Sequence, residues 1–410
     1  MSISTPPREM ADTYPRLARR ASAIPPSPIR KLVDVANAAR ERGIKVYHLN
    51  IGQPDVPTPP AFFDALRDFK EKVLAYGHSK GHAELIKAWS GYYSRIGLDI
   101  PPEMIQITTG GSEAVVFALI LVCDPGDNVI VSEPFYTNYY SLAKSIGVDI
   151  RPVTAEPQLG YRLPPARDIE EAIDSHTRAI IICSPNNPTG TVLTRDEIAT
   201  VVQIADKHRL FILSDEVYRE FCYGESHTSI WQYPQVGDRV ILLDSISKRF
   251  SACGARIGAL ISRNREIMDG ALRLGQARLC TATVEQIAAA RLMDLGPDYY
   301  AALTREYQSR RDLALDRLSA MPGVSCMKPS GAFYLMATLP VDDADNFCRW
   351  LLTEFSHEGQ TAMLAPGAGF YATPGKGRQE ARIAYVLEKP ELARAMDALA
   401  AGLRAYPGRA

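Results

Sequence analysis

The chain has 410 residues, of which 46% are hydrophobic and 23% are charged, and its formal net charge at pH 7 is −1. This length allows two domains, or one large domain with a smaller one, and this composition excludes a disordered chain. Lysine and arginine are spread along the sequence, which excludes a strongly basic surface for nucleic acids and a polybasic membrane anchor.

The first 45 residues are rich in proline and basic residues and turn helical at "IRKLVDVANAARERG" (29–43). Residues 1–20 contain no apolar core of a signal peptide, so we expect a cytoplasmic protein. The seven cysteines include no Cys-x-x-Cys pair, which argues against a disulfide framework and a zinc cage. The histidines of "HSKGH" (78–82) have a gap typical of some zinc pairs, but they lie in a glycine-containing loop, and we expect no metal site.

Short β-branched runs alternate with amphipathic stretches between about residues 60 and 292. The longest apolar stretch, "AVVFALILVC" (114–123), is too short to span a bilayer and predicts a buried helix. Continuous apolar runs suit strands that are covered on both faces, so we expect an α/β fold with a mostly parallel sheet covered by helices. The runs are "NVIVSEP" (128–134), "AIIICSP" (179–185), "LFILSDE" (210–216), "VILLDSI" (240–246) and "IGALIS" (257–262).

Beyond residue 292 the pattern changes. The stretch "YYAALTREYQSRRDLALDRLSAM" (299–321) predicts a long helix, and "GAFYLMATL" (331–339) and "ARIAYVL" (381–387) predict strands. A final helix rich in alanine and leucine follows. This order predicts a second, smaller α+β unit after the large one.

Several of the predicted strands end in polar residues, and ligands of open α/β sheets bind beyond the carboxyl ends of the strands. Asp215 ends one strand, where a carboxylate loses solvation and requires a cationic or protonated partner, although a helix N-cap also explains it. Tyr218 lies on the same side if a helical turn follows. Tyr136 follows another strand, where its ring can stack on a flat heterocycle or belong to the core.

Two turns accompany these strands. "SPNNPTG" (184–190) carries Asn187 at a strand end, and "ITTGGSEAV" (107–115) has glycines between a strand and a helix. Backbone N–H groups at a helix N-terminus bind phosphate. Each turn taken alone is also an ordinary connection.

The segment "DSISKRFSACGARIG" (244–258) contains the motif Ser-x-x-Lys, a signature of serine acyl-enzymes, but the chain lacks the Ser-Asp-Asn and Lys-Thr-Gly partner motifs. Lysine also forms Schiff bases and loses its charge readily when buried. A phosphate-bearing aromatic cofactor requires such a lysine, phosphate-binding groups, a carboxylate for the ring nitrogen and an aromatic cover. Pyridoxal 5′-phosphate fits the set Gly110, Gly111, Ser112, Tyr136, Asp215, Ser245, Lys248 and Arg256.

The chain resembles the class I/II aminotransferases, the aspartate-aminotransferase-like branch of the fold-type I pyridoxal-phosphate enzymes. The resemblance runs from "LNIGQPDVPTP" near residue 50 to "ARIAYV" near residue 385, with the motifs in the order of the family. These motifs are Tyr76, "GGS" (110–112), Tyr136, "NNPTG" (186–190), "SDEVY" (214–218), "SISK" (245–248), Arg256, "KPSGAFYLM" (328–336) and "APGAGFY" (365–371).

The resemblance implies a large cofactor-binding domain (56–292) with a mostly parallel sheet of seven strands. It implies a small α+β C-terminal domain (293–410), which the N-terminal segment (1–55) joins. It also implies a homodimer.

Roles for single residues follow from the same resemblance. Lys248 would form the Schiff base and act as the base for the 1,3-proton shift, and Asp215 would hold the pyridine nitrogen protonated. Tyr218 and Asn187 would hydrogen-bond the ring hydroxyl, and Tyr136 would stack on the ring. The phosphate would be bound by Gly110, Gly111, Ser112, Ser245, Arg256 and the Tyr76 side chain of the neighbouring subunit.

At the substrate, Arg382 would clamp the α-carboxylate bidentately, a geometry that arginine suits and lysine does not. The backbone of Gly52 would close over that carboxylate, and Asn187 would lie beside it. The implied activity is transfer of the amino group of an L-amino acid, such as aspartate, glutamate or an aromatic amino acid, to a 2-oxo acid by a ping-pong mechanism.

Two alternatives remain open at this point. The same cofactor supports β-elimination and oxidase-type reactions, because the pocket chooses which bond breaks. Aminotransferase-like domains also serve as effector-sensing halves of transcription regulators, which carry an added N-terminal DNA-binding domain that we do not expect here.

The sequence leaves the substrate side chain open. A dicarboxylic substrate requires a second cation, and some aspartate-specific relatives have a lysine where this chain has Ser112. Arg30, Arg273 and Arg278 are candidates for that cation, with surface or interface charges as the other interpretation. The aromatic residues Tyr136, Tyr139 and Tyr140 also allow an aromatic substrate.

Overall fold

The computed structural model describes residues 17–224 and 226–409. Residues 1–16 lie outside the described part. They belong to the expected N-terminal segment 1–55 and to residues 1–20, which contain no apolar core of a signal peptide. Within the described residues, no helix is both long and apolar enough to cross a membrane.

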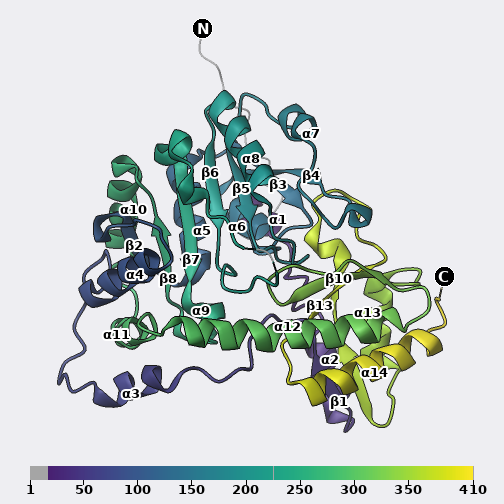
Figure 1. Ribbon diagram of the computed structural model, residues 1–410. Helices are drawn as coiled ribbons and strands as arrows, with labels where there is room; N and C mark the ends of the chain where they lie inside the picture. The colour runs from purple at the N-terminus through teal and green to yellow at the C-terminus, as the bar shows by residue number, and fades with distance from the viewer. Residues whose placement is uncertain (1–16, 225, 410) are drawn as a thin grey trace, which may run out of the picture.

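A seven-stranded sheet forms the centre of the molecule (Figure 1), in the order β2-β8-β7-β6-β5-β3-β4. The five strands from β7 to β4 run parallel, and β8 is antiparallel to both β2 and β7. The prediction of an α/β fold with a mostly parallel sheet is therefore confirmed. The strands are β2 (Ile105–Thr108), β3 (Asn128–Glu133), β4 (Asp149–Thr154), β5 (Thr177–Cys183), β6 (Phe211–Asp215), β7 (Val240–Ser245) and β8 (Gly258–Ile261).

Helices cover both faces of this sheet because its strands are apolar on both sides. On β7, Val240 and Leu242 pack into a core shared with α3, α4, α8 and α11, whereas Ile241 and Leu243 pack into a core shared with α5, α6 and α10. These helices are α3 (Pro60–Asp68), α4 (Ala83–Arg95), α5 (Gly110–Val122), α6 (Asn138–Ile146), α8 (Arg195–His208), α10 (Arg265–Arg278) and α11 (Thr283–Leu292). The predicted buried helix at 114–123 is α5.

A second part of the molecule combines both ends of the chain. β1 (Lys45–His48) pairs in parallel with β11 (Gln360–Met363), beside a four-stranded antiparallel sheet in the order β12-β13-β10-β9. The strands of that sheet are β9 (Ser325–Cys326), β10 (Tyr334–Thr338), β12 (Ala365–Pro366) and β13 (Glu380–Ala384).

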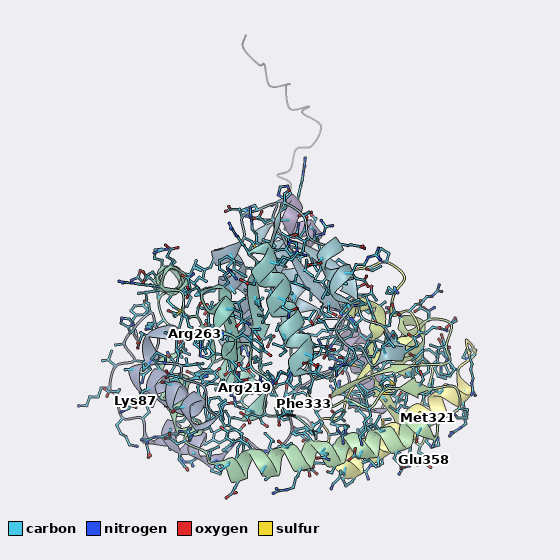
Figure 2. The ribbon with its side chains drawn as sticks, turned by 45° about the horizontal axis from the view of Figure 1, so that its top comes forward. Lys87, Arg219, Arg263, Met321, Phe333 and Glu358 are labelled. Carbon is cyan, nitrogen blue, oxygen red and sulfur yellow. The ribbon has the colours of Figure 1, made fainter. Side chains whose placement is uncertain are left out.

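The long helix α12 (Pro297–Ser319) runs along one side of the molecule from the central sheet to this second part (Figure 1). Phe333, labelled near the middle of the molecule in Figure 2, belongs to an aromatic cluster with Tyr218, Phe221 and Tyr307. This cluster joins the end of β6 to α12 and β10, so it connects the central sheet with the second part. The remaining helices are α1 (Arg19–Ala23), α2 (Val33–Glu41), α7 (Ala166–Glu171), α9 (Ile246–Arg249), α13 (Ala344–Thr353) and α14 (Lys389–Ala405).

Candidate active site

A pocket of about 430 Å³ lies beyond the carboxyl ends of β6 and β7, where an open α/β sheet is expected to bind ligands. It gathers segments that are as far apart in the sequence as Arg30 and Arg382. Eleven of the thirteen predicted site residues line it: Gly52, Gly111, Ser112, Tyr136, Asn187, Asp215, Tyr218, Ser245, Lys248, Arg256 and Arg382.

Lys248 lies on α9, a single helical turn that follows β7 directly. Its Nζ donates a hydrogen bond of 2.8 Å to the carbonyl oxygen of Gly52. Burial lowers the pKa of Lys248, and the guanidinium groups of Arg382 and Arg256 act in the same direction. A lysine whose pKa is lowered spends more time as the neutral amine, which is the nucleophilic and basic form.

Asp215 is the last residue of β6 and is buried, with 7% of its surface exposed. Its Oδ2 accepts a hydrogen bond of 2.6 Å from the hydroxyl of Tyr139, and its Oδ1 accepts one of 3.3 Å from the backbone N–H of Val217. Burial raises the pKa of Asp215 to about 6, although both hydrogen bonds lower it. Among the described residues, no lysine, arginine or histidine forms an ion pair with Asp215, so this carboxylate lacks a cationic partner.

Arg382 lies on β13 and is buried, with 1% of its surface exposed. Its Nη1 donates to Oδ1 of Asn187 at 2.8 Å, its Nη2 donates to the carbonyl oxygen of Asn50, and its Nε has no partner within the described chain. The guanidinium lies 4.4 Å from the ring centroid of Tyr334 and 4.9 Å from that of Phe370. The planar group is therefore fixed at the pocket wall with donor capacity left over.

The other wall of the pocket carries two hydroxyl groups in contact. Tyr218 and Tyr334 lie with their hydroxyl oxygens 2.8 Å apart. A Cβ atom added at Gly52 would lie 1.7 Å from the Tyr334 hydroxyl, so only glycine allows the backbone of this loop to approach. Tyr334 belongs to the motif "GAFYLM", whose sequence alone predicts no role for this residue.

The N-terminus of α5 forms an anion-binding corner, because the first N–H groups of a helix have no partner within it. Gly111 and Ser112 line the pocket there, and Gly110 lies just behind them with a φ of 72°. A Cβ atom at Gly110 would lie 2.2 Å from Nη2 of Arg256, so the glycine lets this guanidinium pack against the start of the helix. Ser247, which sequence analysis did not single out, adds a further hydroxyl.

Two predicted site residues and two candidate cations do not line the pocket. Gly110 is buried behind it, and Tyr76 is 82% exposed at a distance from the lining. Arg273 is exposed elsewhere, and Arg278 forms an ion pair of 2.9 Å with Glu113. The interpretation of Arg273 and Arg278 as surface or interface charges therefore fits better, whereas Arg30 lines the pocket.

The three tyrosines considered for an aromatic substrate also differ in position. Tyr136 lines the pocket, Tyr139 is turned toward Asp215, and Tyr140 packs beside Lys144. The sequence does not predict that Tyr139 donates a hydrogen bond to Asp215, because nothing in the local pattern shows which partner the phenol contacts.

The groups that line the pocket are complementary to pyridoxal 5′-phosphate. The start of α5 and Arg256 suit its phosphate, and the amine of Lys248 suits an aldehyde. The carboxylate of Asp215, which has no cationic partner among the described residues, suits a protonated ring nitrogen. The half-buried ring of Tyr136 offers an aromatic cover at the same wall. The residues present therefore fit the cofactor.

Residues 44–399 match the family described as Aminotransferase class I and II. The chain is 32% identical to an aspartate aminotransferase of Thermotoga maritima over 359 residues, which cover 86% of this chain and 92% of that protein. It is also 32% identical to a probable N-acetyl-LL-diaminopimelate aminotransferase of Bacillus subtilis, with 86% of this chain and 88% of the relative covered.

Solved structures give the same likeness. The fold superimposes on the aspartate aminotransferase of Thermotoga maritima with a TM-score of 0.86 and 29% identity, over 95% of this chain and 100% of that one. The alanine aminotransferase of Pyrococcus furiosus gives the same TM-score of 0.86, identity of 29%, and coverage of 95% and 100%.

Proposed function

The chain belongs to the class I and II aminotransferase family and is a transaminase, and from this premise we propose that it uses pyridoxal 5′-phosphate to move the amino group of an L-amino acid to a 2-oxo acid by a ping-pong mechanism. The observation that carries the proposal is the buried carboxylate of Asp215, which has no cationic partner in the part of the chain that the structure describes and shares one pocket with Lys248 and Arg382. The relatives named above are all aminotransferases, and nothing favours the lyase or oxidase alternative.

When bound, pyridoxal phosphate supplies an aldehyde that condenses with amines and a ring that accepts the electron pair of a broken Cα–H bond. Lys248 supplies the amine that meets the aldehyde, and its Nζ then accepts and returns a proton as a general base. Asp215 keeps the proton on the ring nitrogen, because a carboxylate beside that nitrogen favours its charged form. Tyr218 and Asn187 orient the ring through its hydroxyl.

The phosphate is held by charge and by backbone donors. The N-terminus of α5 presents N–H groups at 110–112, and Arg256 and Ser245 add a guanidinium and a hydroxyl. Tyr136 covers the ring. These groups would hold the phosphate and the ring, and Lys248 would supply the amine for the aldehyde.

The activity is tested by mixing the purified protein with pyridoxal phosphate and a panel of amino donors, with 2-oxoglutarate or pyruvate as the acceptor. We expect formation of the new amino acid and of the 2-oxo acid of the donor in equal amounts. Release of ammonia without amino transfer would contradict the proposal.

Arg382→Lys keeps the charge at the α-carboxylate but loses the planar fork and its second hydrogen bond. We expect kcat/KM to fall by about 10- to 100-fold, the loss of one hydrogen bond to a charged group. The fall should be similar for every donor, because all amino acids share the α-carboxylate. Steady-state kinetics over the donor panel measure it, and a loss confined to one class of side chain would refute the role.

Arg30 is our candidate for the distal carboxylate of a dicarboxylic substrate. The described residues that line the pocket carry four cationic side chains and one carboxylate. Lys248, Arg256 and Arg382 have partners in the cofactor or in the α-carboxylate, so Arg30 remains free for the substrate side chain. Several relatives are aspartate aminotransferases, which agrees with a dicarboxylic partner.

Arg30→Ala should lower kcat/KM for aspartate, glutamate or 2-oxoglutarate. It should leave kcat/KM for monocarboxylic donors unchanged. Because Arg30 is exposed, water screens its charge, and we expect a loss of about tenfold at most. Arg273→Ala, which removes an exposed arginine outside the pocket, is the matched control. A uniform loss over the donor panel would overturn the assignment.

We also propose a homodimer in which Tyr76 completes the phosphate site of the partner subunit. Tyr76 is 82% exposed, and the nearby Val73 and Leu74 are 74% and 64% exposed, an apolar segment suited to a second copy of the chain. Lys248→Ala and Tyr76→Ala subunits, each inactive or impaired alone, should regain activity when mixed, because one site of the hybrid dimer is intact. Sedimentation that shows a fully active monomer would refute the dimer.

A further inference from the structure

Asp244 is a fully buried carboxylate at the end of β7, one residue before Ser245. Its Oδ2 accepts hydrogen bonds of 2.7 Å from the Tyr93 hydroxyl and 3.1 Å from Nε1 of Trp89, both on α4. Its Oδ1 accepts one of 2.7 Å from the backbone N–H of Ser245. The carboxylate is thus fixed to the sheet, to α4 and to the start of the next turn.

Arg249 follows Lys248 directly and is also buried, with 1% of its surface exposed. Its Nη2 donates to Oδ1 of Asp244 and, at 3.4 Å, to the carbonyl oxygen of Ser245. Its guanidinium lies 4.5 Å from the ring centroid of Tyr92. Burial opposes the charge of Arg249, but Asp244 together with Tyr92, Tyr93 and Glu220 outweighs it, and these groups hold the pKa of Arg249 well above its ordinary value.

This ion pair closes the turn that carries the pocket residues Ser247 and Lys248 and begins after the pocket residue Ser245. Asp244 precedes the turn and Arg249 ends it, so the bond between them fixes both ends of α9. A buried ion pair adds little stability over well-packed apolar residues of the same volume, whereas removal of one partner is strongly destabilising. Stability alone therefore does not account for the pair, and its place around Lys248 suggests a geometric role.

A second buried ion pair lies beside it. Arg219, labelled near the middle of Figure 2, pairs with Glu216, and its guanidinium lies 5.0 Å from the ring centroid of Tyr93. Glu216 follows Asp215 and also accepts a hydrogen bond from Ser229. Tyr93 thus contacts both buried ion pairs, Asp244–Arg249 through its hydroxyl and Glu216–Arg219 through its ring.

We propose that the Asp244–Arg249 ion pair is a positioning device that aims the Lys248 amine at the cofactor aldehyde. It does so by fixing α9 to α4 through Tyr93 and Trp89, so that the amine starts in reach of the aldehyde and loses little freedom when a bond forms. The inference rests on the proposed function, because it requires that Lys248 condenses with the aldehyde, forming a carbon–nitrogen double bond and releasing one water.

The test compares two forms of the cofactor. Pyridoxal phosphate condenses with Lys248, whereas pyridoxamine phosphate binds the same phosphate and ring sites but has no aldehyde. In the double variant Asp244→Asn/Arg249→Met, which removes both charges, we expect affinity for pyridoxamine phosphate to stay within about twofold of wild type. Affinity for pyridoxal phosphate should fall about tenfold, measured by the absorbance change on condensation.

The outcomes are distinct. Unchanged affinity for both forms, or an equal loss for both, would overturn the positioning role, since the pair would then be neutral or merely structural. If wild-type protein binds pyridoxal phosphate without the absorbance change and Lys248→Ala binds it equally well, the proposed function itself fails.

A milder pair of variants decides the matter if the double variant does not fold. Tyr93→Phe removes one hydrogen bond to Asp244, whereas Tyr92→Phe removes the neighbouring bond to Glu220 and leaves Asp244 unchanged. Both tyrosines are buried on α4, so the substitutions are matched. We expect a selective loss of pyridoxal phosphate affinity of about two- to fivefold for Tyr93→Phe alone. The same loss in both variants, or in neither, would overturn the inference.

Discussion

Lys248→Ala should abolish turnover, because the amine that meets the aldehyde and the base that moves the proton disappear together. We expect kcat to fall by about 10⁴-fold or more, the upper range for loss of an acid–base group. The variant should still bind the cofactor through Arg256 and Asp215, so equilibrium dialysis should find it loaded while steady-state assays find it inactive.

A lysine on the surface serves as the control. Lys207 lies on α8 and forms an exposed ion pair with Glu170, which contributes little to stability. Lys207→Ala should therefore retain wild-type turnover. Near-normal turnover of Lys248→Ala itself would refute the assignment of the catalytic lysine.

Asp215→Ala should leave the pyridine nitrogen largely unprotonated, so that the ring accepts electrons less readily. The step that removes the α-proton should slow most, by about 10²-fold or more, since a lost charge partner removes several kcal/mol of transition-state stabilisation. Single-turnover kinetics with the amino acid alone isolate this half-reaction. An unchanged single-turnover rate would contradict the role.

The raised pKa of Asp215 allows a second test of the environment of this carboxylate, through the pH dependence of stability. In protein without cofactor the folded-state pKa of about 6 lies above the ordinary value of 3.8, because burial disfavours the charge. The folded state then holds a proton that the unfolded state has lost, so this group lowers stability as pH rises from 4 to 6. Thermal unfolding of the cofactor-free proteins across that range should therefore show a larger loss of stability in the wild type than in Asp215→Ala.

The sequence predicts the parts of the site that lie at strand ends. Asp215 and Lys248 each follow a continuous apolar run, and the topology of a parallel sheet brings such positions to one edge. Arg382 lies more than 100 residues later and was placed by the resemblance to the aminotransferases rather than by local pattern. The predicted sheet and the predicted helix around 114–123 follow from hydrophobic patterning alone.

What the sequence does not predict are contacts between distant side chains. The hydrogen bond from Tyr139 to Asp215 and the contact of Tyr334 with Gly52 depend on how helices and loops pack across the chain. The roles of charged side chains are equally hard to predict from the sequence. Arg278, for example, forms an ion pair with Glu113, and only the fold reveals that partner. The role proposed for Tyr76 requires a second chain, which no single sequence displays.

The pairing of β1 with β11 has a consequence for the order of events during synthesis. The strand at Lys45–His48 leaves the ribosome early, whereas its partner at Gln360–Met363 follows roughly 300 residues later, a delay on the order of tens of seconds at typical translation speed. The strands of the central sheet, at 105–261, are all made within that interval. The nascent chain therefore carries the unpaired strand β1, with its edge open to wrong partners, until about the last eighth of the polypeptide emerges.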